Sequence, residues 1–200
     1  LSPFGGYREV LWLAYPIVVT MVSRTVITFV DTAMVGQLGI VQMAAVGLAG
    51  ILTWTVFSFF GGFLTCVNTF VAQYHGADQP KMIAIVVWQG LYLAVGSYLL
   101  LLLINRFIPY CFELMKPSVE VQQLGIIYAQ IRLYGGIFIF ISFALSGFLL
   151  GIGDTRTPMW IEIVANLTNV VFDYLLIFGH FGFPRLEVVG AAVSTVISGG

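Results

Sequence analysis

Charge is scarce in this sequence. Of its 200 residues, 8 are Lys or Arg and 9 are Asp or Glu, whereas 60% are hydrophobic. The mean hydropathy is +1.01. A chain this apolar lies outside the composition range of soluble domains. The net charge of −1 also gives no basic surface for nucleic acid. We therefore predict a membrane protein with membrane lipid, and no nucleic acid, among its partners.

Cysteines and catalytic motifs are also few. Cys66 lies inside an apolar run and Cys111 near a predicted loop. Their spacing fits neither a metal nor a redox motif, so we interpret them as packing residues with free thiols. The sequence contains no HExxH, GxSxG, P-loop or paired-His motif, which argues against a protease, a hydrolase or an ATP-driven pump within this stretch. We expect no enzyme and no cofactor.

Long hydrophobic runs are abundant. A membrane-spanning helix needs about 20 apolar residues. Six segments qualify or begin to: Val10–Leu38, Met43–Tyr74, Ile83–Ile104, Leu124–Leu150, Pro158–Gly179 and Val188 onward (188–200). The sequence predicts an all-α polytopic membrane protein without β-sheet, in which Lys81 and Lys116 lie on opposite sides of the bilayer.

The sixth segment is incomplete, because the 13 residues from Val188 are too few to cross a membrane. The first residue is Leu1 rather than Met. We therefore expect a fragment of a longer protein.

Prolines shape two of the predicted helices. Pro16 lies inside the first apolar segment and predicts a kink, because proline removes a backbone hydrogen bond. Thr157 is expected to cap the fifth helix, with Pro158 as its first helical residue.

Two carboxylates lie inside apolar segments. A carboxylate at membrane depth is costly and usually binds or relays an ion. The first and fifth segments run in the same direction. Asp31 precedes Gly36–Gly39, and Asp173 precedes Gly179–Gly182, by similar distances along the chain. At 1.5 Å per residue, both carboxylates are expected at a depth of roughly 10 Å below the same surface. This predicts a shared site; the alternative for Asp31 is a side chain that reaches toward the interface.

The fifth segment carries a polar stripe. Glu162, Asn166, Asn169 and Asp173 lie within roughly 40° of one line along a helix. This pattern indicates an ion or proton pathway, although Asn169 and Asp173 could instead clamp two helices together. Glu162 could simply face water near the helix start. Arg24 is interpreted as a structural counter-charge that pairs with Glu162 or another acid, or bonds backbone carbonyls.

Several short motifs occur in a characteristic order. They are Val30-Asp-Thr-Ala-Met-Val-Gly-Gln-Leu-Gly39, Met43-Ala-Ala-Val-Gly-Leu48, Ala72-Gln-Tyr-His-Gly-Ala77, Gly151-Ile-Gly-Asp-Thr-Arg-Thr-Pro158, Asn166-Leu-Thr-Asn169, Asp173-Tyr-Leu-Leu-Ile-Phe-Gly179 and Gly190-Ala-Ala-Val-Ser-Thr195. Together they resemble the N-terminal half of a multidrug and toxic compound extrusion (MATE) transporter.

The resemblance implies one six-helix transmembrane lobe of a twelve-helix, two-lobe transporter that alternates access. It implies a bacterial inner-membrane antiporter that exports small cationic or amphipathic compounds in exchange for H⁺ or Na⁺, with a second lobe of the same chain as partner. The implied cation or proton site consists of Asp31, Asn169, Asp173 and Thr195, with Na⁺ as one candidate ion at the first three. Some members carry a Tyr where this chain has Ile27.

Two alternatives stay open. A lipid-linked oligosaccharide flippase of the same broad superfamily would call for several cavity Arg or Lys residues, for which Arg24 and Arg132 are the candidates. The second alternative is a membrane protein without transport function, either an enzyme or a scaffold. An enzyme would need a nucleophile–base pair or a metal cluster, and neither is visible in the sequence.

Overall fold

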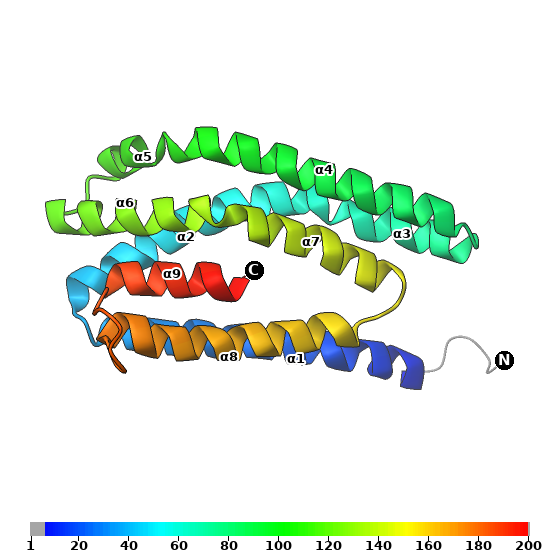
Figure 1. The fold of residues 1–200 in the computed structure, drawn as a ribbon, viewed down its shortest axis with the longest axis horizontal. Helices are drawn as coiled ribbons and strands as arrows, with labels where there is room; N and C mark the ends of the chain where they lie inside the picture. Colours follow the sequence, from blue (N-terminus) through cyan, green and yellow to red (C-terminus); the bar gives the residue numbers. More distant parts are fainter. Residues whose placement is uncertain (1–6, 200) are drawn as a thin grey trace.

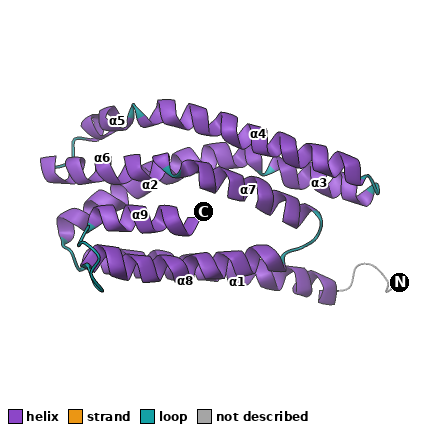
Figure 2. Cartoon of the chain, in the orientation of Figure 1, coloured by secondary structure: helices purple, strands orange, loops and turns teal. Residues whose placement is uncertain are grey.

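Helices are the only regular secondary structure in the part that the structure, a computed structural model, describes (residues 7–199). They are α1 (Tyr7–Gly36), α2 (Ile40–Leu64), α3 (Cys66–Gly76), α4 (Pro80–Asn105), α5 (Ile108–Met115), α6 (Val119–Tyr134), α7 (Gly136–Gly151), α8 (Arg156–Phe178) and α9 (Val188–Gly199) (Figure 1). No strand occurs between residues 7 and 199 (Figure 2). The predicted all-α class is confirmed.

Each predicted span corresponds to one helix or to a helix pair. Four stretches are long and apolar enough to cross a membrane: α1, α2 with α3, α4, and α8. The pair α6 and α7, bent by 47°, adds a fifth, and α9 is a shorter apolar helix. The second and fourth predicted spans are therefore interrupted, near Thr65 and Gly135.

One helix lies where the sequence predicted only a loop. The short helix α5 follows α4, with Pro109 in its first turn, where proline has no hydrogen bond to lose. It ends at Lys116, which adopts a left-handed conformation with φ 50°. Phe112 of α5 is fully buried, and a Cβ built on Gly125 of α6 would lie 2.5 Å from its ring. The missing side chain at Gly125 therefore lets α5 pack closely on α6.

The start of α8 differs from the prediction by two residues. The helix begins at Arg156 rather than Pro158, and the capping side chain is Asp154 rather than Thr157. Asp154 Oδ1 accepts hydrogen bonds from the backbone N–H groups of Arg156 (3.1 Å) and Thr157 (3.0 Å), and the Thr157 hydroxyl donates to Oδ2 (2.6 Å). A carboxylate can accept all three hydrogen bonds at once, which a single hydroxyl cannot.

The helices pack as one elongated bundle. Helices α1 and α8 lie side by side along one edge, α9 lies next to α8, and α4 lies along the opposite edge (Figure 1). Between these edges α2 packs on α6, and α3 packs on α7. The core is apolar and rich in aromatic rings, including Phe57, Phe60 and Phe140. Helix α1 continues through Pro16 without interruption, and the kink there stays a prediction.

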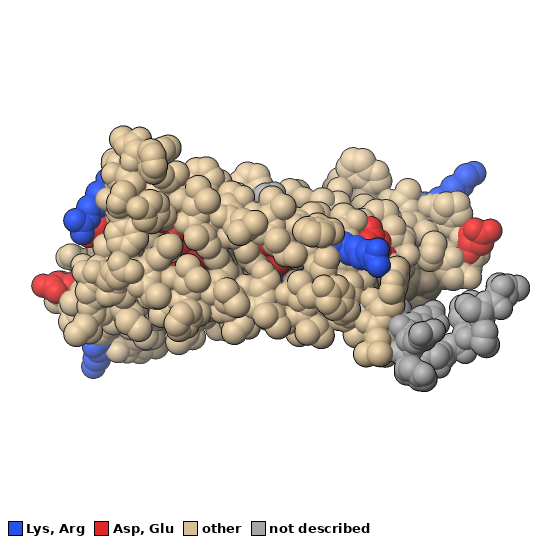
Figure 3. Space-filling view, turned by 90° about the horizontal axis from the view of Figure 1, so that it is seen from below, with Lys and Arg blue, Asp and Glu red and all other residues tan. Residues whose placement is uncertain are grey.

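The surface of the bundle is largely apolar. Large side chains such as Phe29 (74% exposed) and Leu114 (76%) point outward. The face in Figure 3 has a broad, mostly uncharged middle, with Lys and Arg lying mainly toward the ends. An apolar surface of this extent is expected to face lipid.

Candidate functional site

The two membrane carboxylates meet inside the bundle. Because α1 packs along α8, the carboxyl groups of Asp31 and Asp173 lie next to each other. Asp173 is 1% exposed, and Asp31 is half-buried. The predicted proximity of these two residues is confirmed.

Helix α9 adds a hydroxyl to this pair. The Ser194 side chain is fully buried and hydrogen-bonds to Asp173 Oδ1. The same hydroxyl lies 3.0 Å from the Ala191 carbonyl, and having one proton it donates to one acceptor at a time. The Thr195 hydroxyl instead donates to the Ala191 carbonyl (2.7 Å). Neighbouring residues on a helix point about 100° apart, so the sequence could not tell which of the two hydroxyls faces Asp173.

Two buried polar atoms at the site have no hydrogen-bond partner among the described residues. They are Asp31 Oδ1 and the amide nitrogen of Asn169, a residue that is 4% exposed and lies one helical turn before Asp173. A buried polar group without a partner is costly. A bound proton or cation would satisfy the carboxylate, and a flip of the Asn169 amide would present its oxygen to a cation.

The rest of the polar stripe faces α1. The Arg24 guanidinium forms a two-pronged ion pair with Glu162, with Nε–Oε1 at 2.7 Å and Nη2–Oε2 at 3.0 Å. The Asn166 amide donates to the Ser23 hydroxyl at 2.8 Å. The stripe is therefore divided. Its first half joins α8 to α1, and its second half contributes Asp173 to the carboxylate pair and places Asn169 one turn before it.

Arg132 is a basic residue near the site. The sequence indicates it only as a candidate basic residue of a substrate cavity. Arg132 lies on α6, about one turn before Gly135, which packs against Val196 of α9. Its guanidinium carbon lies 5.8 Å from the centre of the Tyr128 ring and 6.0 Å from that of Phe57. The sequence gives no signal for this arrangement, because it depends on how α6 packs against α2 and α9.

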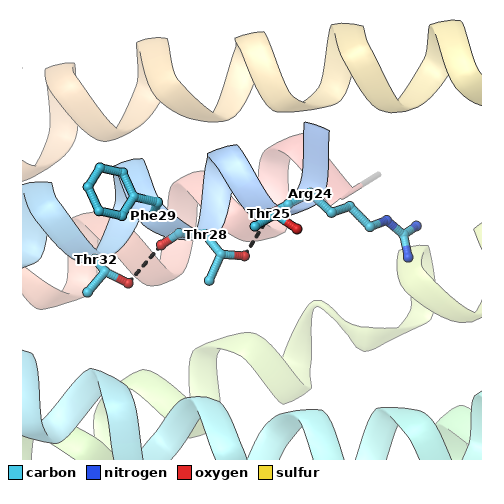
Figure 4. Close-up of a pocket in the computed structure, with 5 residues that line it drawn as sticks. All are labelled: Arg24, Thr25, Thr28, Phe29 and Thr32. Atoms are coloured by element: carbon cyan, nitrogen blue, oxygen red, sulfur yellow. Dashed lines mark hydrogen bonds between the residues drawn. The ribbon is translucent and has the colours of Figure 1, made fainter. Parts of the chain in front are cut away.

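A groove of about 430 Å³ runs along α1. Its lining residues are Arg24, Thr25, Thr28, Phe29 and Thr32 (Figure 4). The three threonine hydroxyls donate to backbone carbonyls one turn back, at 2.7–3.0 Å. Because these hydroxyls are already bonded, the groove presents mainly methyl groups and one aromatic ring.

Fold and site together define a helical membrane-protein lobe with a buried pair of carboxylates. The chain belongs to the MatE family, whose model matches residues 16–175. It is thus a multi-pass integral membrane protein of this family.

The relatives and solved structures agree on this assignment. The chain is 32% identical over 197 residues to a probable multidrug resistance protein NorM of Geobacillus kaustophilus, covering 98% of the chain and 43% of that protein. It resembles the structure of a MATE protein in its bent conformation, with a TM-score of 0.85 and 26% identity, covering 96% of this chain and 42% of that one. It also resembles a MOP superfamily transporter from Pyrococcus furiosus, with a TM-score of 0.83, 26% identity, and coverage of 96% and 42%. For that transporter, a binding pocket of reverse polarity suggests a different function.

The chain spans about two fifths of the length of the curated relatives that it matches. This share fits an N-terminal half.

Proposed function

We propose that this chain forms one lobe of a bacterial plasma-membrane antiporter that exports cationic or amphipathic compounds in exchange for H⁺ or Na⁺. The observation that carries the proposal is the buried Asp31–Asp173 pair, with Asn169 and Ser194 beside it. The name of the Geobacillus relative, a probable multidrug resistance protein, supports an export function. We expect no enzymatic step and no resident cofactor.

The coupling step follows from charge. Two ionised carboxylates in contact repel each other, and a proton or a monovalent cation between them offsets the repulsion. For Na⁺, the candidate oxygen ligands are those of Asp31, Asp173, Asn169 and Ser194, since oxygen is the usual ligand for hard cations. For H⁺, the carboxylate pair alone suffices. Thr195 would join as a cation ligand only by leaving its bond to the Ala191 carbonyl.

The site is positioned to move helices. Its groups come from α1, α8 and α9, so loading or unloading one charge changes the contacts among three helices at once. A change of a few kcal/mol is enough to shift the balance between two packings. The groove on α1, whose lining runs from Arg24 to Thr32 and so passes Asp31 along the helix, is where an amphipathic substrate would sense that movement.

The flippase alternative has less support than the antiporter. An anionic headgroup needs free basic side chains, and the structure pairs Arg24 with Glu162. Of the two candidate arginines, only Arg132 has no ion-pair partner within the described residues.

The test is transport by the intact protein in membrane vesicles. Uptake of a radiolabelled organic cation is measured with the pH gradient and the Na⁺ gradient varied separately. Asp31→Asn and Asp173→Asn are expected to abolish coupled transport while the protein still inserts, because each keeps the side-chain size and removes a charge. Asn169→Ala is expected to weaken the response to the cation without abolishing it.

Glu162→Gln is the matched control. The side chains of Glu162 and Arg24 are 23% and 55% exposed. The loss of their ion pair is therefore expected to lower the free energy of unfolding by at most about 1 kcal/mol and to leave transport coupled. Transport that survives in both Asp variants would overturn the proposal. If Glu162→Gln were as damaging as Asp31→Asn at normal expression, the coupling site would lie at Glu162 instead.

A further inference from the structure

Arg132 is a partly buried cation without an ion-pair partner in the described part of the chain. Its Nε atom is buried and makes no hydrogen bond there. The guanidinium lies near the rings of Phe57 and Tyr128, at 6.0 and 5.8 Å from their centres. Aromatic faces compensate only part of the cost of burying a charge. Because arginine stays protonated in proteins, its charge has to be balanced by something else.

The matching negative charge lies on the neighbouring helices. Asp31 Oδ1 is also buried and has no hydrogen-bond partner among residues 7–199, and it belongs to the pair that Asp31 forms with Asp173. Helix α6, which carries Arg132, packs against α9, whose Ser194 bonds Asp173. The other arginine of this region, Arg24, is already held by Glu162.

The distance between the two groups matters for their role. Arg132 and Asp31 make no ion pair within 4.0 Å. Helix α6 approaches the carboxylate pair through α9, since Gly135, about one turn after Arg132, packs against Val196, two residues after Ser194. A contact pair would occupy the carboxylate oxygens and block a cation. A positive charge held further away lowers the net charge of the site but leaves those oxygens free.

We propose that Arg132 is a built-in counter-charge of the Asp31–Asp173 pair. Because its positive charge offsets one of the two carboxylates, the pair needs to bind only one monovalent cation, instead of two, to become neutral. With both carboxylates ionised, the three groups together carry a net charge of −1, since two negative charges meet one positive charge. One H⁺ or one Na⁺ then neutralises the site. This inference rests on the proposed function, because it names the residue that sets how much charge the coupling site accepts.

The first experiment is a double-mutant cycle on thermal unfolding of the intact protein in detergent, in Na⁺-free buffer at one pH. The proteins are wild type, Arg132→Gln, Asp31→Asn and the double variant. Arg132→Gln is expected to lower the unfolding midpoint when Asp31 is present and to have little effect in the Asp31→Asn background. Additive effects of the two substitutions would overturn the proposal.

Two matched variants separate charge from packing. Arg132→Lys keeps the positive charge and is expected to behave more like wild type than Arg132→Gln does. If Lys were as damaging as Gln, the role of Arg132 would be to pack on the aromatic rings, and the proposal would fail. Arg24→Gln in place of Arg132→Gln is expected to be additive with Asp31→Asn, because Arg24 pairs with Glu162.

The second experiment measures Na⁺ binding. NaCl replaces choline chloride at constant ionic strength, and the shift of the unfolding midpoint is followed. Removing a nearby positive charge is expected to strengthen Na⁺ binding by at least about tenfold in Arg132→Gln. Unchanged or weaker binding, or no Na⁺ response in Arg132→Gln, overturns the proposal.

The two proposals can fail separately. Vesicles that show no coupled transport by the wild type, together with a non-additive cycle, would overturn the proposed function and leave the counter-charge standing. Coupled transport together with an additive cycle would do the reverse.

Discussion

Polar residues in this lobe differ in how completely their hydrogen bonds are satisfied. Glu162 has both of its carboxylate oxygens bonded to Arg24, near the surface. Asp31 and Asn169 each keep an interior atom that has no hydrogen-bond partner in the described part of the chain. Because burying such atoms is costly, their presence supports the ion site proposed around Asp31, Asn169 and Asp173.

The two neighbouring hydroxyls of α9 are expected to differ in importance. Ser194→Ala removes the buried hydroxyl that bonds Asp173 and should lower the free energy of unfolding by about 1–3 kcal/mol and reduce coupled transport. Thr195→Val keeps the shape of the side chain and removes only a bond within the helix. Thermal unfolding and vesicle transport measured on both variants provide the test. A larger loss of transport in Thr195→Val would instead favour Thr195, the residue that the resemblance to the family implies.

The cap of α8 should make the protein sensitive to acid. Hydrogen bonds hold the pKa of Asp154 below its usual value. The bond from the Thr157 hydroxyl has the largest effect, and those from the backbone N–H groups of Thr157 and Arg156 add to it. A lowered pKa stabilises the folded state above the ordinary Asp value of about 3.9, and this stabilisation is lost as the pH falls through the folded-state pKa.

Asp154→Asn is therefore expected to lower the unfolding midpoint near neutral pH and to differ less from wild type as the solution is acidified. Unfolding scans across the acidic range measure this convergence. A difference between the two proteins that does not change with pH would show that the carboxylate charge has no part in the cap.

At the scale of elements, helix α9 depends on a close backbone approach to α8. A Cβ on Gly190 would lie 2.6 Å from the carbonyl oxygen of Leu176 and 2.7 Å from its carbon. Backbone atoms cannot rotate away as side chains do, so any side chain at Gly190 must push the two helices apart. The carbonyl of Leu176 also accepts a hydrogen bond from the N–H of Leu186 at 2.8 Å, which fixes the turn before α9.

Gly190→Ala is expected to destabilise the protein by about 1–3 kcal/mol and to disturb the Ser194–Asp173 bond. The matched control is Gly96→Ala in α4, where nothing lies within 4 Å of the new Cβ. There alanine should stabilise the helix by up to about 1 kcal/mol. Equal unfolding midpoints for the two variants would contradict the close approach.

Across the whole molecule, the helix order sets which loops share a side of the membrane. Helix α4 has 26 residues and is about 39 Å long, so Lys81 near its start and Lys116 beyond its end lie at opposite ends of the bundle. The start of α8, where Arg156 is the first residue, lies toward the same end of the bundle as the start of α4, which contains Lys81 (Figure 1).

Single cysteines at Lys81, Lys116 and Arg156 test this arrangement, in a background where Cys66 and Cys111 are replaced by Ala. A membrane-impermeant thiol reagent added to intact cells is expected to distinguish Lys116 from the other two positions. Labelling of Lys81 and Lys116 from one side would refute the fold as a membrane lobe.

Much of this protein can be predicted from its sequence. Apolar runs of spanning length predict helices, because a helix satisfies all of its backbone hydrogen bonds within the lipid. The equal depth of Asp31 and Asp173 also follows from counting residues along helices of fixed rise.

Only the tertiary structure decided which side chains complete the site. The choice of Ser194 over Thr195, the capture of Arg24 by Glu162 and the packing of α6, which carries Arg132, on α9 depend on helix rotation and packing. The breaks near Thr65 and Gly135 and the buried Phe112 of α5 depend on packing as well. Hydropathy reports how deep a residue lies but not which neighbour it faces, because contacts between helices distant in sequence determine the direction of each side chain.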